Sequence, residues 1–158
     1  MVQLGRRALP TREQLHIWRG YIETAEALRT RLGSRMQSES SLSTGDYQVL
    51  LALSEADGKS MRASALASHI GWERSRLSHH LGRMEKRGLI DRTTCDDDVH
   101  GIEVSMTSSG AESFRAGSVP HLRAVRELFV DALTPEQLTQ VENLTRALRV
   151  HLDVDPEG

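Results

Sequence analysis

The chain has few of the residues that build a large hydrophobic core. Aromatic residues make up 4% of its 158 residues, and apolar residues make up 38%. Because a compact monomer with so few large side chains would have a thin core, this composition favours burial against a second subunit. The length suits one domain, or a small domain with additional helices.

Cysteine and long apolar runs are also scarce. The single cysteine, Cys95, excludes a disulfide within the chain and fits a reducing cytoplasm. No apolar run approaches the roughly 20 residues of a membrane-spanning helix. Arg6 and Arg7 near the start are not followed by the apolar segment of a secretory signal. These features predict a cytoplasmic protein that does not enter a membrane.

The chain has no overall basic charge, but its basic residues are unevenly distributed. The formal net charge is −2, so composition alone does not predict a nucleic-acid-binding protein. Residues 59–92 contain eight basic and three acidic side chains, whereas the remainder contains twelve basic and nineteen acidic ones. A positive segment on a negative body would approach phosphates with one face first.

Residues 63–92 have the pattern of two short helices joined by a tight turn and followed by a strand. Gly71 falls at the turn, where a positive φ is favoured, and the small Ala67 allows the helices to cross closely. Each helix has one apolar stripe with helical spacing. The stripes consist of Leu66, Ala67 and Ile70 in the first helix and of Leu77, Leu81 and Met84 in the second. This pattern predicts a helix-turn-helix.

The outward face of the second helix is basic and polar. Its candidate DNA-binding residues are Ser75, Arg76, Ser78, His79, Arg83 and Lys86. Two carboxylates, Glu73 and Glu85, fall at the ends of the helix and away from this face. A basic face of this kind suits the major groove of DNA, whereas the simpler alternative is a charged, solvated helix.

Six helices and one hairpin are expected along the whole chain. Thr11 with Gln14, Ser43 with Asp46, and Thr134 with Gln137 each have the spacing of a capping box, and Thr107 is a further N-cap. The first helix should run through residue 36, and the helix after Thr107 should be bent or interrupted near Pro120. Strands are expected at 89–94 and 102–106, around a polar loop at 96–101.

The predicted fold is therefore mainly α with a small β-hairpin wing: a winged helix-turn-helix flanked by N- and C-terminal dimerisation helices. The apolar stripes of the first helix and of the last two are longer than the compact winged core can cover. The alternative to dimerisation is that these helices fold back onto their own subunit.

Three motifs resemble the MarR family of transcriptional regulators. They are GLIDR at 88–92, the Asp-rich loop that follows it, and VSMTSSG at 104–110. The resemblance implies a sequence-specific DNA-binding regulator, in most members a repressor of a near-palindromic operator, released by a small-molecule effector. It implies a homodimer with dimerisation segments at 1–40 and 111–158, a DNA-binding domain at 42–110, and double-stranded DNA as the partner.

The resemblance also implies roles for single residues. Arg76 and His79 occupy the positions that meet base edges, and an arginine with two hydrogen bonds to guanine discriminates by about 1–3 kcal/mol. Ser75 and Ser78 are short donors for a phosphate or a neighbouring base, and Arg83 and Lys86 hold phosphates. The wing residues expected at DNA are Arg92 and His100.

The wing departs from the family pattern Asp-x-Arg-Gly. The matching run is Asp98, Val99, His100, Gly101, so a histidine replaces the arginine, and three consecutive aspartates precede it at 96–98. Aspartates would repel phosphates, so we expect them to be paired, with Arg92 as the candidate partner, or turned away. Contacts of the wing with DNA are then either weak or strengthened when His100 is protonated.

By the same resemblance, an effector pocket would lie where the long first helix meets the winged domain. Trp18 and Tyr21 are candidate walls, and His16 and Arg19 are candidate polar anchors. Trp18 also lies on the apolar stripe, so a simple packing role is the alternative.

Other chemistries have weaker signals. His79 and His80 are adjacent and point about 100° apart on a helix, which disfavours a metal site, and no cofactor is expected. Carboxylates near Cys95 disfavour its thiolate, although a redox-responsive regulator acting through Cys95 stays an alternative. The second alternative is a winged-helix module that binds another protein. Neither a nucleophile elbow nor a phosphate loop is present, so no enzyme is predicted.

The histidine in the wing leads to a testable prediction. Operator affinity should rise in mildly acidic solution for the wild type and should be less dependent on pH for His100→Ala. Fluorescence anisotropy with a labelled operator over a pH series measures both. Parallel pH profiles for the two proteins would contradict a role for His100.

Overall fold

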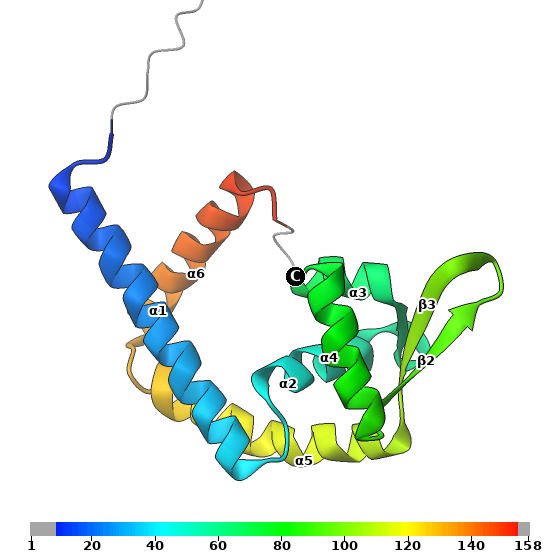
Figure 1. Ribbon diagram of the computed structural model, residues 1–158. Helices are drawn as coiled ribbons and strands as arrows, with labels where there is room; N and C mark the ends of the chain where they lie inside the picture. The colour runs from blue at the N-terminus through cyan, green and yellow to red at the C-terminus, as the bar shows by residue number, and fades with distance from the viewer. Residues whose placement is uncertain (1–8, 155–158) are drawn as a thin grey trace, which may run out of the picture.

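The computed structural model describes residues 9–154, except for the side chains of Asp98 and Val99. The protein is mainly helical with one small sheet (Figure 1). Its regular elements are α1 (Arg12–Glu39), α2 (Thr44–Glu55), β1 (Ser60–Arg62), α3 (Ala63–Ile70), α4 (Arg74–Lys86), β2 (Ile90–Cys95), β3 (Asp98–Met106), α5 (Ser108–Val125) and α6 (Pro135–His151).

Four helices, α1, α2, α5 and α6, begin at the predicted caps. Reciprocal capping boxes form between Thr11 and Gln14, between Ser43 and Asp46, and between Thr134 and Gln137. Each box satisfies two backbone N–H groups that would otherwise lack partners at a helix N-terminus. The first helix continues to Glu39, three residues past its predicted end.

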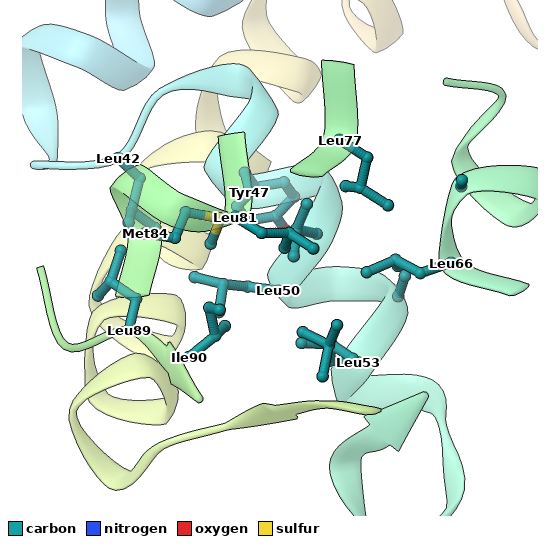
Figure 2. Packing of buried hydrophobic residues seen from close by; sticks show 14 of the residues in the cluster. Leu42, Tyr47, Leu50, Leu53, Leu66, Leu77, Leu81, Met84, Leu89 and Ile90 are labelled. Atoms are coloured by element: carbon teal, nitrogen blue, oxygen red, sulfur yellow. The ribbon is translucent and has the colours of Figure 1, made fainter. Parts of the chain in front are cut away.

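The hydrophobic core lies between α2, α3, α4 and the sheet. Figure 2 shows side chains from these elements pointing toward one another, with Leu50 of α2 near its centre. The predicted stripes are confirmed: Leu66, Ala67, Leu77, Leu81 and Met84 are buried, and Ile70 packs against the cluster. Gly71 ends α3 with a φ of 71°, a conformation that favours glycine. The two helices therefore form a helix-turn-helix whose second member, α4, has one face in the core.

The sheet contains one strand that the sequence did not predict. Its order is β1-β3-β2, with β3 antiparallel to both neighbours. Three residues are too few to give β1 a recognisable alternation. β3 also begins earlier than predicted, because Cys95 pairs with Asp98 across a turn at 96–97. His100 and Gly101 consequently lie on a strand, where a loop was expected, and the wing is a longer hairpin.

The helix after Thr107 was predicted to be bent or interrupted near Pro120, and it is not interrupted there. Helix α5 continues through Pro120 to Val125, and the departure from α geometry is a wider π turn at Arg126–Val130. A proline removes only one backbone hydrogen bond, and α5 is held on both sides of Pro120: Gly117 packs against Leu42, and Ala124 is buried. The elements from α2 to β3, residues 44–106, form the winged unit. In Figure 1, α5 underlies the winged unit and leads to α6, which rises with α1 away from that unit.

Gly110 leads to a stability prediction. A Cβ atom at this position would lie 2.0 Å from the backbone oxygen of Leu89, which cannot move without disturbing the sheet. Gly110→Ala should therefore lower the free energy of unfolding by about 3 kcal/mol or more. Gly20→Ala is the matched control, because a Cβ there meets nothing within 4 Å, and it should stabilise α1 by up to about 1 kcal/mol. Urea unfolding at one protein concentration measures both, and a neutral Gly110→Ala would contradict the packing described.

Candidate nucleic-acid interface

Helix α4 presents every predicted recognition residue to solvent. Its buried stripe faces the core, so the opposite face exposes Ser75, Arg76, Ser78, His79, Arg83 and Lys86. Of the two carboxylates that flank this face, Glu85 is half-buried and accepts from Arg92 at 3.1 Å. This ion pair lowers the pKa of Glu85, so the carboxylate stays ionised and turned toward β2.

A buried carboxylate holds α4 against α2. Asp46 is 2% exposed, and it accepts hydrogen bonds from His80 Nε2 at 2.9 Å, Arg87 Nη1 at 2.7 Å and the Ser43 backbone at 2.9 Å. Burial alone would raise the pKa of Asp46, but the hydrogen bonds from His80, Ser43 and Arg87 outweigh it and hold this pKa far below its usual range. Sequence reasoning identified Asp46 only as a cap, because its partners are 34 and 41 residues away.

The tautomer of His80 follows from its neighbours. Arg83 Nη2 lies 3.0 Å from His80 Nδ1, and a guanidinium can only donate, so Nδ1 is the acceptor. The proton is then on Nε2, which donates to Asp46. One imidazole therefore connects the buried Asp46 to Arg83 on the exposed face of α4.

Trp72 lies in the turn between α3 and α4 and contacts two residues of α4. The Arg76 guanidinium carbon is 4.1 Å from the centre of the indole ring. The His80 ring meets the indole edge to face, with centroids 5.2 Å apart. Sequence reasoning did not single out Trp72, although its spacing of four residues from Arg76 is a signal for contact at a helix N-terminus.

A basic groove separates α4 from the wing. Its volume is about 370 Å³, and its lining includes Arg62, Arg74, Arg92 and His100 but no carboxylate among the described residues. Both predicted wing residues thus lie in one groove with α4.

Arg92, the expected candidate partner of the wing aspartates, pairs with neither Asp96 nor Asp97, the two whose side chains the structure describes. Arg92 pairs with Glu85, and it is Arg62 that holds Asp97, at 2.7 and 2.8 Å. The register explains the difference, because residue 92 is opposite Val104 at the base of the hairpin, far from the turn at 96–97. One acidic side chain of the wing is therefore neutralised by β1.

The predicted effector residues do not form a pocket with the winged domain of the same chain. His16, Trp18, Arg19 and Tyr21 are all exposed, on the half of α1 that extends away from the winged unit (Figure 1). Trp18, 59% exposed, lines an open apolar hollow with Pro10, Gln14 and Leu15. A 28-residue helix is too long for its first half to reach the core that its last turns contact.

A larger hollow, of about 590 Å³, lies where α1 does meet the winged unit. Its lining includes Arg29 of α1, Gln48 of α2, and Trp72, Arg76 and Arg83, with no carboxylate among the described residues. The resemblance implied an effector pocket at this junction, but none of the residues predicted for it lines this hollow, because its walls come from four separate segments.

Among the side chains that the structure describes, no three histidine, cysteine, aspartate or glutamate residues are grouped as metal ligands would be. None of the described helices is both long and apolar enough to cross a membrane.

The helix-turn-helix, the antiparallel hairpin after it and the basic groove between them define a winged helix-turn-helix protein. Comparison with known proteins agrees. The family model described as MarR family matches residues 40–98. AbsC, a MarR family transcriptional regulator from Streptomyces coelicolor, is 34% identical, with a TM-score of 0.84 over 92% of this chain and 98% of AbsC. The chain therefore belongs to the MarR family of transcriptional regulators.

Two other relatives extend the comparison. Sco3205, a MarR family regulator from Streptomyces coelicolor whose structure was determined in complex with DNA, is 33% identical, with a TM-score of 0.83 over 89% of each chain. The transcriptional repressor MprA of Escherichia coli K12 is 27% identical over 139 residues, which cover 81% of this chain and 78% of MprA.

The buried network gives a prediction for stability and pH. Asp46→Asn should lower the free energy of unfolding at neutral pH by about 2–4 kcal/mol, because it leaves His80 and Arg87 without their ionised acceptor. The folded pKa of Asp46 lies below the value of about 4 for an unfolded aspartate. The contribution of the network is therefore complete above about pH 4 and is lost as the pH falls further.

Urea unfolding of both proteins between neutral pH and the acid limit of folding tests this. The difference in the free energy of unfolding between wild type and Asp46→Asn should shrink below about pH 4. Glu142→Gln, which breaks the exposed pair with Arg146, is the control and should change stability only slightly at any pH. A difference that is independent of pH would contradict the ionised network.

Proposed function

We propose that the protein is a homodimeric repressor in the cytoplasm, which binds a near-palindromic DNA operator and is released by a small-molecule effector. The observation that carries this proposal is the exposed face of α4, with Arg76, His79, Arg83 and Lys86 and no carboxylate. The complex of the related Sco3205 with DNA supports the same partner for this chain.

The position of each residue along α4 suggests its part in binding. Arg76 is near the helix N-terminus, the end from which recognition helices contact base edges, so Arg76 and His79 would read bases. Ser75 and Ser78 would donate to a phosphate or a neighbouring base, and Arg83 and Lys86, farther along the helix, would hold phosphates. In the groove, Arg74 and His100 would bind the strand that passes between helix and wing, while Arg92 is engaged by Glu85.

Exposed apolar side chains on the flanking helices support a homodimer. They include Leu15, Ile17, Trp18, Tyr21 and Ile22 of α1, and Leu144, Leu148 and Val150 of α6. Apolar surface of this extent is rare on a monomer. Segments 1–40 and 111–158 would thus dimerise and segment 42–110 would bind DNA. The two-fold axis would separate the two α4 helices by about 34 Å, one turn of DNA, or a multiple of it.

The hollow that Arg29, Arg76 and Arg83 line is the best candidate for the effector site. Its volume of about 590 Å³ is that of a small-molecule site, and its cations suit an anionic ligand. A ligand bound there would engage Arg76 and Arg83, which DNA binding also requires. Effector and operator would then oppose each other through shared side chains.

Selection of genomic DNA fragments by the purified protein, at two salt concentrations, tests the proposed function. We expect an enriched near-palindrome whose affinity falls with salt. Arg76→Ala should weaken operator binding by about 1–3 kcal/mol and relax the preference at one base pair of each half-site. Lys86→Ala should weaken binding to all sequences and lower the salt slope by about 1.

Arg146→Ala, on the exposed face of α6, is the control and should bind as the wild type does. Weak binding without any sequence preference, or none, would contradict the proposal. It would instead favour a module that binds another protein.

Sedimentation velocity tests the dimer separately. The wild type should sediment with twice the mass of one chain, and Leu144→Glu combined with Leu148→Glu should shift it toward the monomer, because two carboxylates would be buried at the interface. Thr139→Glu is the control for added charge, because its spacing places it on the side of α6 away from Leu144 and Leu148. A wild type that sediments as one chain at micromolar concentration would contradict the dimer.

A further inference from the structure

We propose that Trp72 is a positioning residue for sequence recognition: its indole fixes where the Arg76 guanidinium lies in front of α4. The inference rests on the proposed function and deepens it. It assigns part of the selectivity for bases to a side chain that contacts no base itself.

The contact between Arg76 and Trp72 leaves the arginine able to bind DNA. The guanidinium carbon lies over the indole ring, 4.1 Å from its centre, so the cation contacts the face of the indole. Hydrogen bonds to a guanine use the N–H groups at the edge of the guanidinium, so a cation–π contact and base recognition are compatible. Among the described residues, no ion pair or hydrogen bond engages Arg76, so the indole is what limits its rotamers.

The indole is itself fixed by contacts with residues other than Arg76. The His80 ring meets it at 89°, and His80 donates to the buried Asp46 at 2.9 Å. The Trp72 backbone N–H donates to the Ala67 carbonyl at 2.9 Å. A continuous series of contacts therefore joins the buried Asp46 to the exposed Arg76.

Gly45 shows how closely this series is packed. A Cβ atom on Gly45 would lie 2.9 Å from Trp72 Cη2 and 2.9 Å from His80 Cε1. His80 cannot retreat without losing Asp46, so the indole would have to move. The lack of a side chain at position 45 thus allows the Trp72 indole to occupy the position in which it contacts Arg76.

Packing alone is the alternative explanation, because Trp72 also touches the hydrophobic core. The two explanations differ in what they predict for DNA. Loss of packing lowers stability and weakens binding to all sequences alike. Loss of positioning lowers the ratio of affinities for the operator and for a site changed at the base pair that Arg76 reads, and only while Arg76 is present.

The experiment measures this discrimination ratio for wild type, Trp72→Leu, Trp72→Phe, Arg76→Ala and the double variant Trp72→Leu/Arg76→Ala. Arg76→Ala identifies the base pair concerned. Trp72→Leu should lower the ratio about 3- to 10-fold, and Trp72→Phe, which keeps an aromatic face, should lower it less. In the Arg76→Ala background, Trp72→Leu should cause no further loss.

Gly45→Ala provides a variant that keeps both side chains. It should lower the ratio in the same direction as Trp72→Leu, even if Trp72→Leu folds poorly. NMR of the free proteins gives a readout without DNA: ring-current shifts of the Arg76 side-chain protons should be present in the wild type and absent in Trp72→Leu.

Each outcome decides one question. Additive losses in the double variant, a Trp72→Leu effect equal on all sequences, or missing ring-current shifts would overturn the positioning role while DNA recognition stands. If the shifts are present but the wild type selects no sequence, or Arg76→Ala alters no preference, the proposed function fails and the inference fails with it.

Discussion

The arrangement of the winged unit depends on one buried carboxylate. Asp46 is almost fully enclosed, yet it accepts from the start of its own helix, from the middle of α4 and from Arg87 beyond the end of α4. A buried charge is tolerated only when it is paired and hydrogen-bonded on all sides. The position of α4 relative to α2 is thereby restricted to one that satisfies all three donors at once.

The exposed surface follows from this constraint. With Leu77, Leu81 and Met84 in the core and His80 bound to Asp46, the opposite side of α4 must face solvent. The wing is attached to the same helix through Arg92 and Glu85, and the groove between them is lined by arginines of β1, α4 and β2 and by His100 of β3. Leu89 and Gly110 approach so closely that α5 and the sheet also have little freedom. The surface proposed for DNA is therefore held by the core and by ion pairs on two sides.

Local signals in the sequence predicted much of this. Capping boxes, the glycine at position 71 and the apolar stripes of α3 and α4 depend on residues a few positions apart, and all are confirmed. Features decided by distant neighbours were not predictable: the strand β1, the partner of Asp97, and the network around Asp46. The effector residues predicted around Trp18 illustrate the same limit. An apolar helix face predicts burial, but it does not tell whether the same chain or a second subunit covers that face.

The most direct measurement is a crystal structure of the protein bound to its selected DNA fragment. The expected result is one two-fold dimer with α4 of each subunit in successive major grooves, about 34 Å apart. Arg76 would contact a base edge while its guanidinium lies over Trp72. Asp46 would still accept its hydrogen bonds from His80 and Arg87. A complex in which DNA lies against another face, or in which α4 separates from Asp46 on binding, would contradict the recognition surface described.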